Sequence, residues 1–221
     1  MKSKLFVIIP AYNEGKRIGP VLEKVKKYSK NIIVVDDCSK DDTSEQARKK
    51  KVIVLSNNPN AGKGVALKKG CDYALKKGAK TIIVMDADGQ HEPKDIPRFL
   101  KALDGNDIVF GSRKIDKNMP SVFKFGNWFI NKTTTLLSGI KLVDTQSGFR
   151  AFTANTYRKI RWKSTRYSVE SEMILRVGAK KLRYNEIFIK TIYHDSSKGT
   201  TVWDGIKIVA NMIKWKIKGG V

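Results

Sequence analysis

The sequence is poor in cysteine and has no long hydrophobic run. Its 221 residues include only two cysteines, Cys38 and Cys71, at a spacing that matches no zinc-binding pattern. We therefore expect neither a disulfide framework nor a zinc site, and a reducing cytoplasm is the compartment that fits. No stretch reaches the roughly 18 apolar residues of a membrane-spanning helix, and the first apolar run, residues 5–9, is too short for a signal peptide. These absences predict a chain that is not integral to a membrane.

Acidic residues are scarce as well. The sequence has 21 Asp and Glu residues against 44 Lys and Arg residues, which gives a net charge of +23. This excess predicts an anionic partner, whether phosphate, a nucleic acid or the headgroups of a membrane. The basic residues are spread along helical stretches, so each basic run by itself is typical of a solvated helix face. A nucleic-acid-binding module, whose affinity for DNA or RNA would fall steeply with salt, stays an alternative at this point.

Apolar runs alternate with segments of helical periodicity through the first half of the chain. This alternation predicts an α/β fold with a mostly parallel, doubly wound sheet. The runs that we expect to form strands are residues 5–9, 32–35, 52–55, 81–85 and 107–110. After residue 112 the rhythm changes, with helical patterns at residues 122–140, twice within 155–178 and at 203–217, and a strand-like pattern at 182–193.

The most informative motif follows the fourth apolar run. Asp86 and Asp88, separated by Ala87, come directly after a strand rich in β-branched residues. Two carboxylates spaced two residues apart in an extended stretch point the same way, so they can share one hard cation such as Mg²⁺ or Mn²⁺ with phosphate oxygens. The motif predicts a site for a metal and a diphosphate, and the alternative is an Asp-rich turn without a ligand.

Two earlier runs also end in loops with unusual side chains. After the first run, Tyr12 offers an aromatic face to a base. After the second run, Asp36 and Asp37 are adjacent acids in a basic protein, and we expect them to accept hydrogen bonds from a ribose or a base. Residues 41–43, two aspartates and a threonine, are instead typical of a helix cap.

A glycine-containing turn at residues 57–64 follows the third run. It opens a helical segment whose free N–H groups, together with Lys63, can face a phosphate. The spacing does not match a P-loop, and taken alone such a turn is more often structural.

Four segments taken together resemble the glycosyltransferases of family 2. They share the family's order and spacing, and they read VIIPAYNE at residues 7–14, VVDDCS at 34–39, NAGKG at 60–64 and DADGQ at 86–90. Further along, GSR at residues 111–113 and DTQSGFR at 144–150 are similar to the branch that transfers sugars to polyprenyl phosphates, namely dolichyl-phosphate mannose synthases and related polyprenyl-phosphate glucosyltransferases. The resemblance covers residues 5–198. It implies a GT-A fold, a nucleotide-sugar donor, a divalent cation and inversion at the anomeric carbon.

The resemblance assigns roles to residues of this chain. It implies that the nucleotide sugar is bound by Pro10, Ala11, Tyr12, Glu14, Asp37, Lys63, Asp86, Ala87, Asp88 and Arg113. It implies that Asp86 and Asp88 hold the metal, with Gln90 as an additional ligand, and that Asp88, Arg113 and Asp144 form the catalytic set.

Asp144 occupies the position of the family's usual candidate for a catalytic base. An acceptor phosphate is already largely ionised at pH 7 and can attack without a base, so we expect another role for Asp144. It could orient Arg150, or contact the metal or the sugar, or be a turn aspartate.

The acceptor phosphate is expected to meet Arg150 and Lys198. Many relatives have a histidine, an arginine and a G-x-S-K signature near residue 198, whereas this chain reads His194-Asp195-Ser196-Ser197-Lys198. Lys198 can still bind phosphate, but the arginine is missing.

Two segments are amphipathic on a helical wheel. In the first, the apolar face comprises Val122, Phe125, Phe129, Ile130, Leu136, Leu137 and Ile140. In the second, Trp203, Ile206, Val209, Ala210, Ile213 and Ile217 lie beside Lys207, Lys214 and Lys218. Helices with Trp and Lys suit an anionic membrane surface, and the alternative is that both pack on the sheet or on another subunit.

These observations predict one catalytic GT-A domain over residues 1–200, followed by an amphipathic helix at 201–221. Residues 1–112 would bind the nucleotide sugar and residues 113–200 the acceptor. The expected activity is inverting, metal-dependent transfer of a hexose from GDP-mannose or a UDP-hexose to dolichyl or another polyprenyl phosphate. This product would feed glycan assembly at the cytoplasmic face of the cell membrane. We expect no nucleic acid as partner. A membrane protein or a second copy of the chain is a possible partner. The alternatives are transfer to a soluble or polysaccharide acceptor, a sugar-phosphate nucleotidyltransferase and the nucleic-acid-binding module.

Overall fold

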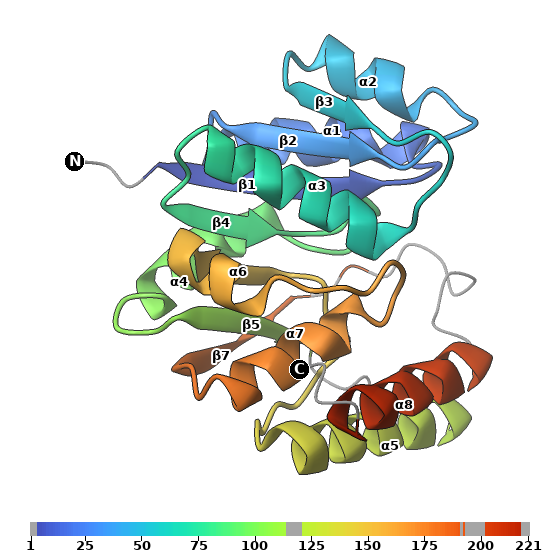
Figure 1. Ribbon diagram of the computed structural model, residues 1–221. Helices are drawn as coiled ribbons and strands as arrows, with labels where there is room; N and C mark the ends of the chain where they lie inside the picture. The colour runs from blue at the N-terminus through green and yellow to red at the C-terminus, as the bar shows by residue number, and fades with distance from the viewer. Residues whose placement is uncertain (1–3, 114–120, 191, 193–201, 218–221) are drawn as a thin grey trace.

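A computed structural model describes residues 4–113, 121–190, 192 and 202–217, and within them a seven-stranded sheet forms the centre of the molecule (Figure 1). The strand order is β3-β2-β1-β4-β6-β5-β7, and β6 runs antiparallel to both of its neighbours while the other pairs are parallel. The strands are β1 (Leu5–Ala11), β2 (Ile32–Asp36), β3 (Ile53–Ser56), β4 (Thr81–Val84), β5 (Ile108–Arg113), β6 (Arg150–Thr153) and β7 (Tyr184–Ile189). The mostly parallel α/β sheet predicted from the sequence is confirmed.

Helices cover both faces of this sheet. One face is covered by α1 (Gly15–Lys26), α2 (Thr43–Lys49) and α4 (Ile96–Ala102), the last preceded by the short 3₁₀ turn η1 (Pro93–Asp95). The other face is covered by α3 (Lys63–Lys76), α6 (Ala154–Ile160) and α7 (Val169–Ala179). Because both faces are covered, the strands are continuous runs of Val and Ile, and every residue of β2 is buried.

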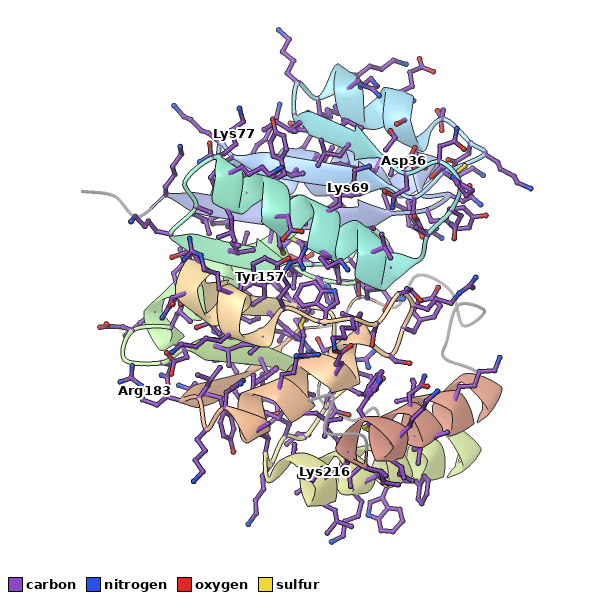
Figure 2. The ribbon with its side chains drawn as sticks, viewed as in Figure 1. Asp36, Lys69, Lys77, Tyr157, Arg183 and Lys216 are labelled. Carbon is purple, nitrogen blue, oxygen red and sulfur yellow. The ribbon has the colours of Figure 1, made fainter. Side chains whose placement is uncertain are left out.

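Helix α3 approaches the sheet closely at Gly70. A Cβ atom at this position would collide with Ile8 of β1 and lie 3.0 Å from Val35 of β2, so the contact requires glycine. Tyr157 lies between α6 and α3 (Figure 2), where its hydroxyl donates to the Asp72 carboxylate at 2.7 Å. These contacts fix the start of α3, which carries Lys63, against the rest of the molecule.

Two helices, α5 (Ser121–Ser138) and α8 (Val202–Ile217), lie side by side at one end of the molecule (Figure 1). Ile130 of α5 and Ile208 and Met212 of α8 are buried together with Leu175 of α7. Within the described residues, no helix has the length and the apolar character of a membrane span.

The predicted apolar face of the first amphipathic segment is divided in the structure. Ile130 and Ile140 are buried, whereas Phe129 and Leu136 are exposed, Leu136 by 82%. On α8, the wheel placed Ile213 and Ile217 on the apolar face, and both are exposed, while Ile208 and Met212 make the buried contact instead. The side chains of Val122, Phe125, Trp203, Ile206 and Lys218 lie outside the described residues.

Candidate active site

The candidate site lies where the strand order reverses. From β1 the chain continues to β2 and β3 on one side, while β4 pairs with the other side of β1, and ligands of open α/β sheets bind outside the carboxyl ends of strands at such a point. Because β6 is antiparallel, the loop that precedes it reaches the same edge. A cavity of about 600 Å³ opens there. Its walls are Pro10, Ala11, Tyr12, Glu14, Asp37, Asn60, Gly62, Lys63, Ala66, Asp86, Ala87, Asp88, Gln90, Arg113, Gln146, Arg166, Tyr167 and Glu170.

All ten residues that the resemblance assigned to the nucleotide sugar line this one cavity, and so does Gln90. They come from the ends of β1, β2, β4 and β5 and from the start of α3. The fold therefore brings together residues that are more than 100 positions apart in the sequence. Their binding roles stay predictions.

The two adjacent acids after β2 have different surroundings. Asp37 lines the cavity, and its carboxylate accepts hydrogen bonds from the backbone N–H groups of Ala61 (2.9 Å) and Gly62 (2.7 Å). Asp36 is not among the described residues that line the cavity, and its carboxylate accepts from the N–H and hydroxyl of Ser39. The expectation that Asp36 accepts a hydrogen bond from a ribose or base is therefore wrong, because a local turn uses its carboxylate.

Of the residues at 41–43, Asp42 makes no side-chain cap bond to α2, but Asp41 Oδ1 accepts from the N–H of Thr43, the first residue of that helix, at 3.0 Å. The same group of residues also contacts α1. Asp41 Oδ2 accepts from the Gly15 N–H at 2.9 Å, and the Thr43 hydroxyl accepts from the Glu14 N–H at 2.8 Å. These bonds hold the start of α1, and with it Glu14, at the cavity.

Three charges meet at the end of β4. The Lys63 ammonium lies 2.6 Å from Asp86 Oδ1 and 2.8 Å from Glu170 Oε1. Burial alone would lower the pKa of Lys63, but the two carboxylates outweigh it and raise the pKa above its ordinary value. Burial likewise acts to raise the pKa of Asp86, and Lys63 outweighs it and lowers the pKa. Both groups are therefore charged at neutral pH.

For Asp88 the attraction of Lys63 is weaker, and burial together with the charge of Asp86 outweighs it and raises the pKa. Asp88 Oδ1 accepts from the Gln90 N–H at 2.9 Å, which fixes the turn between the two residues. Behind this turn the His91 ring packs near Phe149, with its Nδ1 atom 3.3 Å from the Asp86 N–H.

The residues at the end of β4 fit a divalent cation. Two carboxylates line the cavity with the amide of Gln90 beside them, which is the oxygen donor set that Mg²⁺ and Mn²⁺ prefer. Both aspartates are half-buried, and the charge of Asp86 makes ionisation of Asp88 less favourable, which a cation would relieve. Within the described part of the chain, no group of three or more His, Cys, Asp and Glu side chains could hold a metal without help. A cation here would thus take its remaining ligands from a substrate phosphate and water.

The start of α3 differs from the expectation that its N–H groups face a phosphate. The Thr165 carbonyl accepts from the N–H groups of Gly64 (2.8 Å) and Val65 (3.3 Å). The Gly62 N–H donates to Asp37. These donors are thereby used within the protein. Asn60, Gly62 and Lys63 of this turn line the cavity, and Lys63 brings a positive charge to it.

Arg113 and Asp144 form a two-point ion pair. Arg113 Nε donates to Asp144 Oδ2 at 2.6 Å and Arg113 Nη2 donates to Oδ1 at 3.2 Å. Burial acts to raise the pKa of Asp144, but the Arg113 charge and its hydrogen bonds lower it below the ordinary value. Asp144 thus stays ionised and holds the guanidinium at the cavity wall.

Arg150 was predicted to meet the acceptor phosphate, and the structure corrects this. Its guanidinium is buried and donates to the backbone carbonyls of Ser147 (3.1 Å), Glu170 (2.8 Å) and Thr145 (3.0 Å). Burial lowers the pKa of Arg150 to about 10. Arg150 is not among the described residues at the cavity, because it ties the loop before β6 to α7. Asp144 accordingly orients Arg113 and not Arg150. Lys198 and His194 lie outside the described residues.

Sequence reasoning missed Ala66 of α3 and four polar cavity residues, namely Gln146, Arg166, Tyr167 and Glu170. Gln146 stands inside the DTQSGFR motif, so its position carried a signal. The other three polar residues lie at or just before the start of α7, where nothing in the sequence distinguishes a polar residue at a site from one on a helix surface.

The chain was compared with known proteins. The sequence model of the family described as "Glycosyl transferase family 2" matches residues 6–163. "Uncharacterized protein MJ1222" of Methanocaldococcus jannaschii is 45% identical, over 98% of this chain and 93% of the relative. "UDP-N-acetylglucosamine--dolichyl-phosphate N-acetylglucosaminyltransferase" of Methanococcus voltae is 35% identical, over 96% of both chains.

Among solved structures, a similar one is glucosyl-3-phosphoglycerate synthase from Mycobacterium tuberculosis in complex with Mn²⁺, UDP and phosphoglyceric acid. It superposes with a TM-score of 0.72 at 16% sequence identity, over 96% of this chain and 78% of that one. At this identity the likeness concerns the fold, which is the GT-A fold.

Proposed function

The chain belongs to glycosyl transferase family 2, and from this premise we propose that it transfers a hexose from a nucleotide-diphosphate sugar to dolichyl or another polyprenyl phosphate. Hexose here includes N-acetylhexosamine. The observation that carries the proposal is the single cavity in which Tyr12, Asp37, Asp86, Asp88 and Arg113 meet. The Methanococcus voltae relative, named for a dolichyl-phosphate acceptor and matched over nearly its whole length, supports the choice of acceptor.

The donor would lie along the cavity with its base near Tyr12 and Asp37 and its diphosphate near Asp86 and Asp88. Asp86, Asp88 and Gln90 would hold Mg²⁺ or Mn²⁺. The cation, when bound, would neutralise the diphosphate. Lys63 and Arg113 add two positive charges to the same cavity, which is favourable for a ligand with several phosphate charges.

The proposed reaction is a direct displacement. An oxygen of the acceptor phosphate attacks the anomeric carbon, and the bond from that carbon to the diphosphate oxygen breaks, so the electron pair leaves with the nucleoside diphosphate. Negative charge grows on the leaving oxygen, and Arg113, held by Asp144, stabilises it. The acceptor phosphate is already ionised at neutral pH, so no protein base is needed, and attack from the far side inverts the configuration.

We place the enzyme at the cytoplasmic face of the cell membrane as a peripheral protein. The support is the outer side of α5 and α8, which exposes Trp128 by 58%, Leu136 by 82% and Ile217 by 79%. Exposed lysines stand between these side chains on both helices, including Lys132 and Lys214. An apolar surface with interspersed lysines suits anionic lipid, where the acceptor phosphate also resides.

The test is transfer of radiolabelled sugar to dolichyl phosphate in detergent. UDP-N-acetylglucosamine, UDP-glucose and GDP-mannose are offered in turn with Mg²⁺ or Mn²⁺, and with EDTA. We expect a chloroform-soluble product from one donor, lost with EDTA and reduced at least about a hundredfold by Asp88→Asn, which removes one charge without changing shape.

The same substitution at an exposed acid, Glu45→Gln, is the matched control and should leave the rate unchanged, since Glu45 pairs only with Lys49 on the outside of α2. Sugar-nucleotide binding without a lipid product would contradict the proposed acceptor and favour a soluble or polysaccharide one.

A further inference from the structure

Glu170 is a buried acid of the cavity wall, and one of its two carboxylate oxygens has no hydrogen-bond donor among the described residues. It is the second residue of α7, and only 6% of its side chain is exposed. Oε1 lies 2.8 Å from the Lys63 ammonium. Oε2 is buried as well, and no described group donates a hydrogen bond to it. A buried carboxylate oxygen without a donor is unfavourable unless a ligand supplies one.

Pairing with Lys63 does not account for this carboxylate. Asp86 is closer to Lys63, at 2.6 Å, and already neutralises it. The guanidinium of Arg150 lies close enough to attract the Glu170 carboxylate, but its N–H groups donate to backbone carbonyls, including that of Glu170 itself. Glu170 Oε2 is therefore a buried acceptor that no described group uses.

The position of Glu170 in the cavity limits which part of a bound nucleotide sugar can donate a hydrogen bond to Oε2. Glu170 and Asp86 flank one ammonium, so Glu170 stands beside the part of the cavity proposed for the metal and the diphosphate. Phosphate oxygens carry no hydrogen to donate near neutral pH and would be repelled. The ribose and the hexose are joined to opposite ends of the diphosphate, and both carry hydroxyl groups. The proposed pose places the base and its ribose near Tyr12 and Asp37. The hexose, at the other end of the diphosphate, is then the part of the donor whose hydroxyl groups would reach Glu170.

We propose that Glu170 Oε2 accepts a hydrogen bond from a hydroxyl group of the transferred hexose and thereby selects the sugar. This inference rests on the proposed function. A site that hydrogen-bonds a hydroxyl group discriminates strongly against a sugar that lacks it or directs it elsewhere, because the buried carboxylate is then left unpaired. The neighbouring Gln146, which also lines the cavity and donates to Ser171 Oγ at 3.1 Å, supports α7 at this point.

The test separates binding of the sugar from binding of the nucleotide. Calorimetry with Mn²⁺ measures the affinity of UDP and GDP alone and of UDP-N-acetylglucosamine, UDP-glucose and GDP-mannose. For Glu170→Gln we expect the preferred nucleotide sugar to bind about ten- to a hundredfold more weakly, the loss typical of a hydrogen bond to a charged group. The bare nucleotide should change by less than about twofold, since it does not reach Glu170. Glu170→Asp, which keeps the charge and withdraws the oxygen, should change the ratio of affinities among the three sugars.

Two controls make the result specific. Glu45→Gln removes the same charge at an exposed site and should match the wild type. Circular dichroism establishes that each variant is folded, and Glu170→Asp carries the test if Glu170→Gln does not fold.

Equal losses for nucleotide and nucleotide sugar would overturn the inference and mean that Glu170 only positions Lys63. A weaker affinity for Mn²⁺ alone would overturn it in favour of a metal ligand. If the wild type makes the lipid product but neither Glu170 variant alters sugar affinity, the inference fails while the proposed function stands. If the wild type binds no nucleotide sugar, both fail.

Discussion

At the scale of single residues, the ion pair of Arg113 and Asp144 is the feature that would stabilise negative charge on the leaving group. Asp144 accepts two hydrogen bonds from the guanidinium and one from the Gln146 N–H at 3.0 Å. A carboxylate so occupied has a lowered pKa and is a weak base. Its geometry fits a residue that positions Arg113.

We expect Asp144→Asn to lower kcat/KM by about ten- to a hundredfold, because an amide holds the guanidinium through weaker, uncharged hydrogen bonds. The shape of the pH–rate profile should stay that of the wild type. Arg113→Lys should cause a similar loss, and the double variant should lose little more, since the two residues act as a unit. Loss of the acidic limb of the profile in Asp144→Asn would instead identify Asp144 as a base.

At the scale of elements, the segment between α6 and α7 holds the start of α3. Glu172 of α7 accepts from the N–H groups of Lys163 (2.9 Å) and Ser164 (2.7 Å) and from Arg176 Nε (2.7 Å). The carbonyl of Thr165, the residue after Ser164, accepts hydrogen bonds from the N–H groups of Gly64 and Val65. A buried carboxylate thus connects α7 through one short loop to Lys63.

This arrangement predicts a pH-dependent stability. Burial acts to raise the pKa of Glu172, but its hydrogen bonds lower it below the ordinary 4.5. The carboxylate therefore stabilises the fold above pH 4.5, and this stability is lost as the pH falls through the lower, folded-state pKa. Glu172→Gln should lower the free energy of unfolding by about 2–4 kcal/mol at pH 7.

Urea unfolding at pH 7 and at several values below 4.5 provides the measurement. The difference between the wild type and Glu172→Gln should shrink as the pH is lowered, because the amide does not titrate. A difference that stays constant across this range would show that packing, and not the charge, stabilises the loop.

The sequence predicted the five apolar runs that became β1 to β5. Strands β1, β2, β4 and β5 are buried in the sheet, and such strands are continuous apolar runs rich in Val and Ile. Strand β3 is a partly buried edge strand, and its three apolar residues were enough to indicate it. Strand β6, Arg150–Thr153, was missed because four residues are too few to show a period, and because its first residue is a buried arginine. Helix α4 was not singled out either, as seven residues give too little pattern.

The candidate site was predictable where strand ends carry motifs and unpredictable where a role depends on contacts between distant segments. Asp86 and Asp88 follow from spacing alone. The neighbouring sequence does not reveal that Arg113 lies at the cavity whereas the buried Arg150 donates hydrogen bonds to three backbone carbonyls. Glu170 was missed because its partner, Lys63, lies more than 100 residues away in the sequence. The bonds of Asp36 to Ser39 are local, but the residue types alone do not reveal them.

At the scale of the whole molecule, α5 and α8 combine a packed inner side with an apolar outer side. We expect the double variant Leu136→Glu, Ile217→Glu to bind vesicles containing anionic lipid at least about tenfold more weakly, because burying each apolar side chain in a membrane contributes about 1.5–3 kcal/mol. Flotation with vesicles of phosphatidylcholine and phosphatidylglycerol measures the bound fraction.

The single variant Leu136→Glu is compared with Tyr28→Glu as its control, which adds one negative charge as well, at an exposed aromatic residue beyond the end of α1. Binding of the Tyr28→Glu variant should match the wild type. Equal losses in both variants would assign the effect to net charge, and no loss in either would contradict the proposed membrane surface.

The position of β6 has a consequence for how the chain is made. During synthesis β5 emerges from the ribosome before both of its sheet partners, β6 and β7. The first four strands can pair as soon as residue 84 is available, whereas β5 must wait until residues 150–153 arrive to sit between it and β4. A nascent or truncated chain ending at residue 112 would expose one edge of β4 and an unpaired hydrophobic β5. The sheet of this enzyme therefore assembles in one order, with β1 to β4 first and β5 only after β6 has been made. A chain cut between β5 and β6 would leave a fragment prone to aggregation.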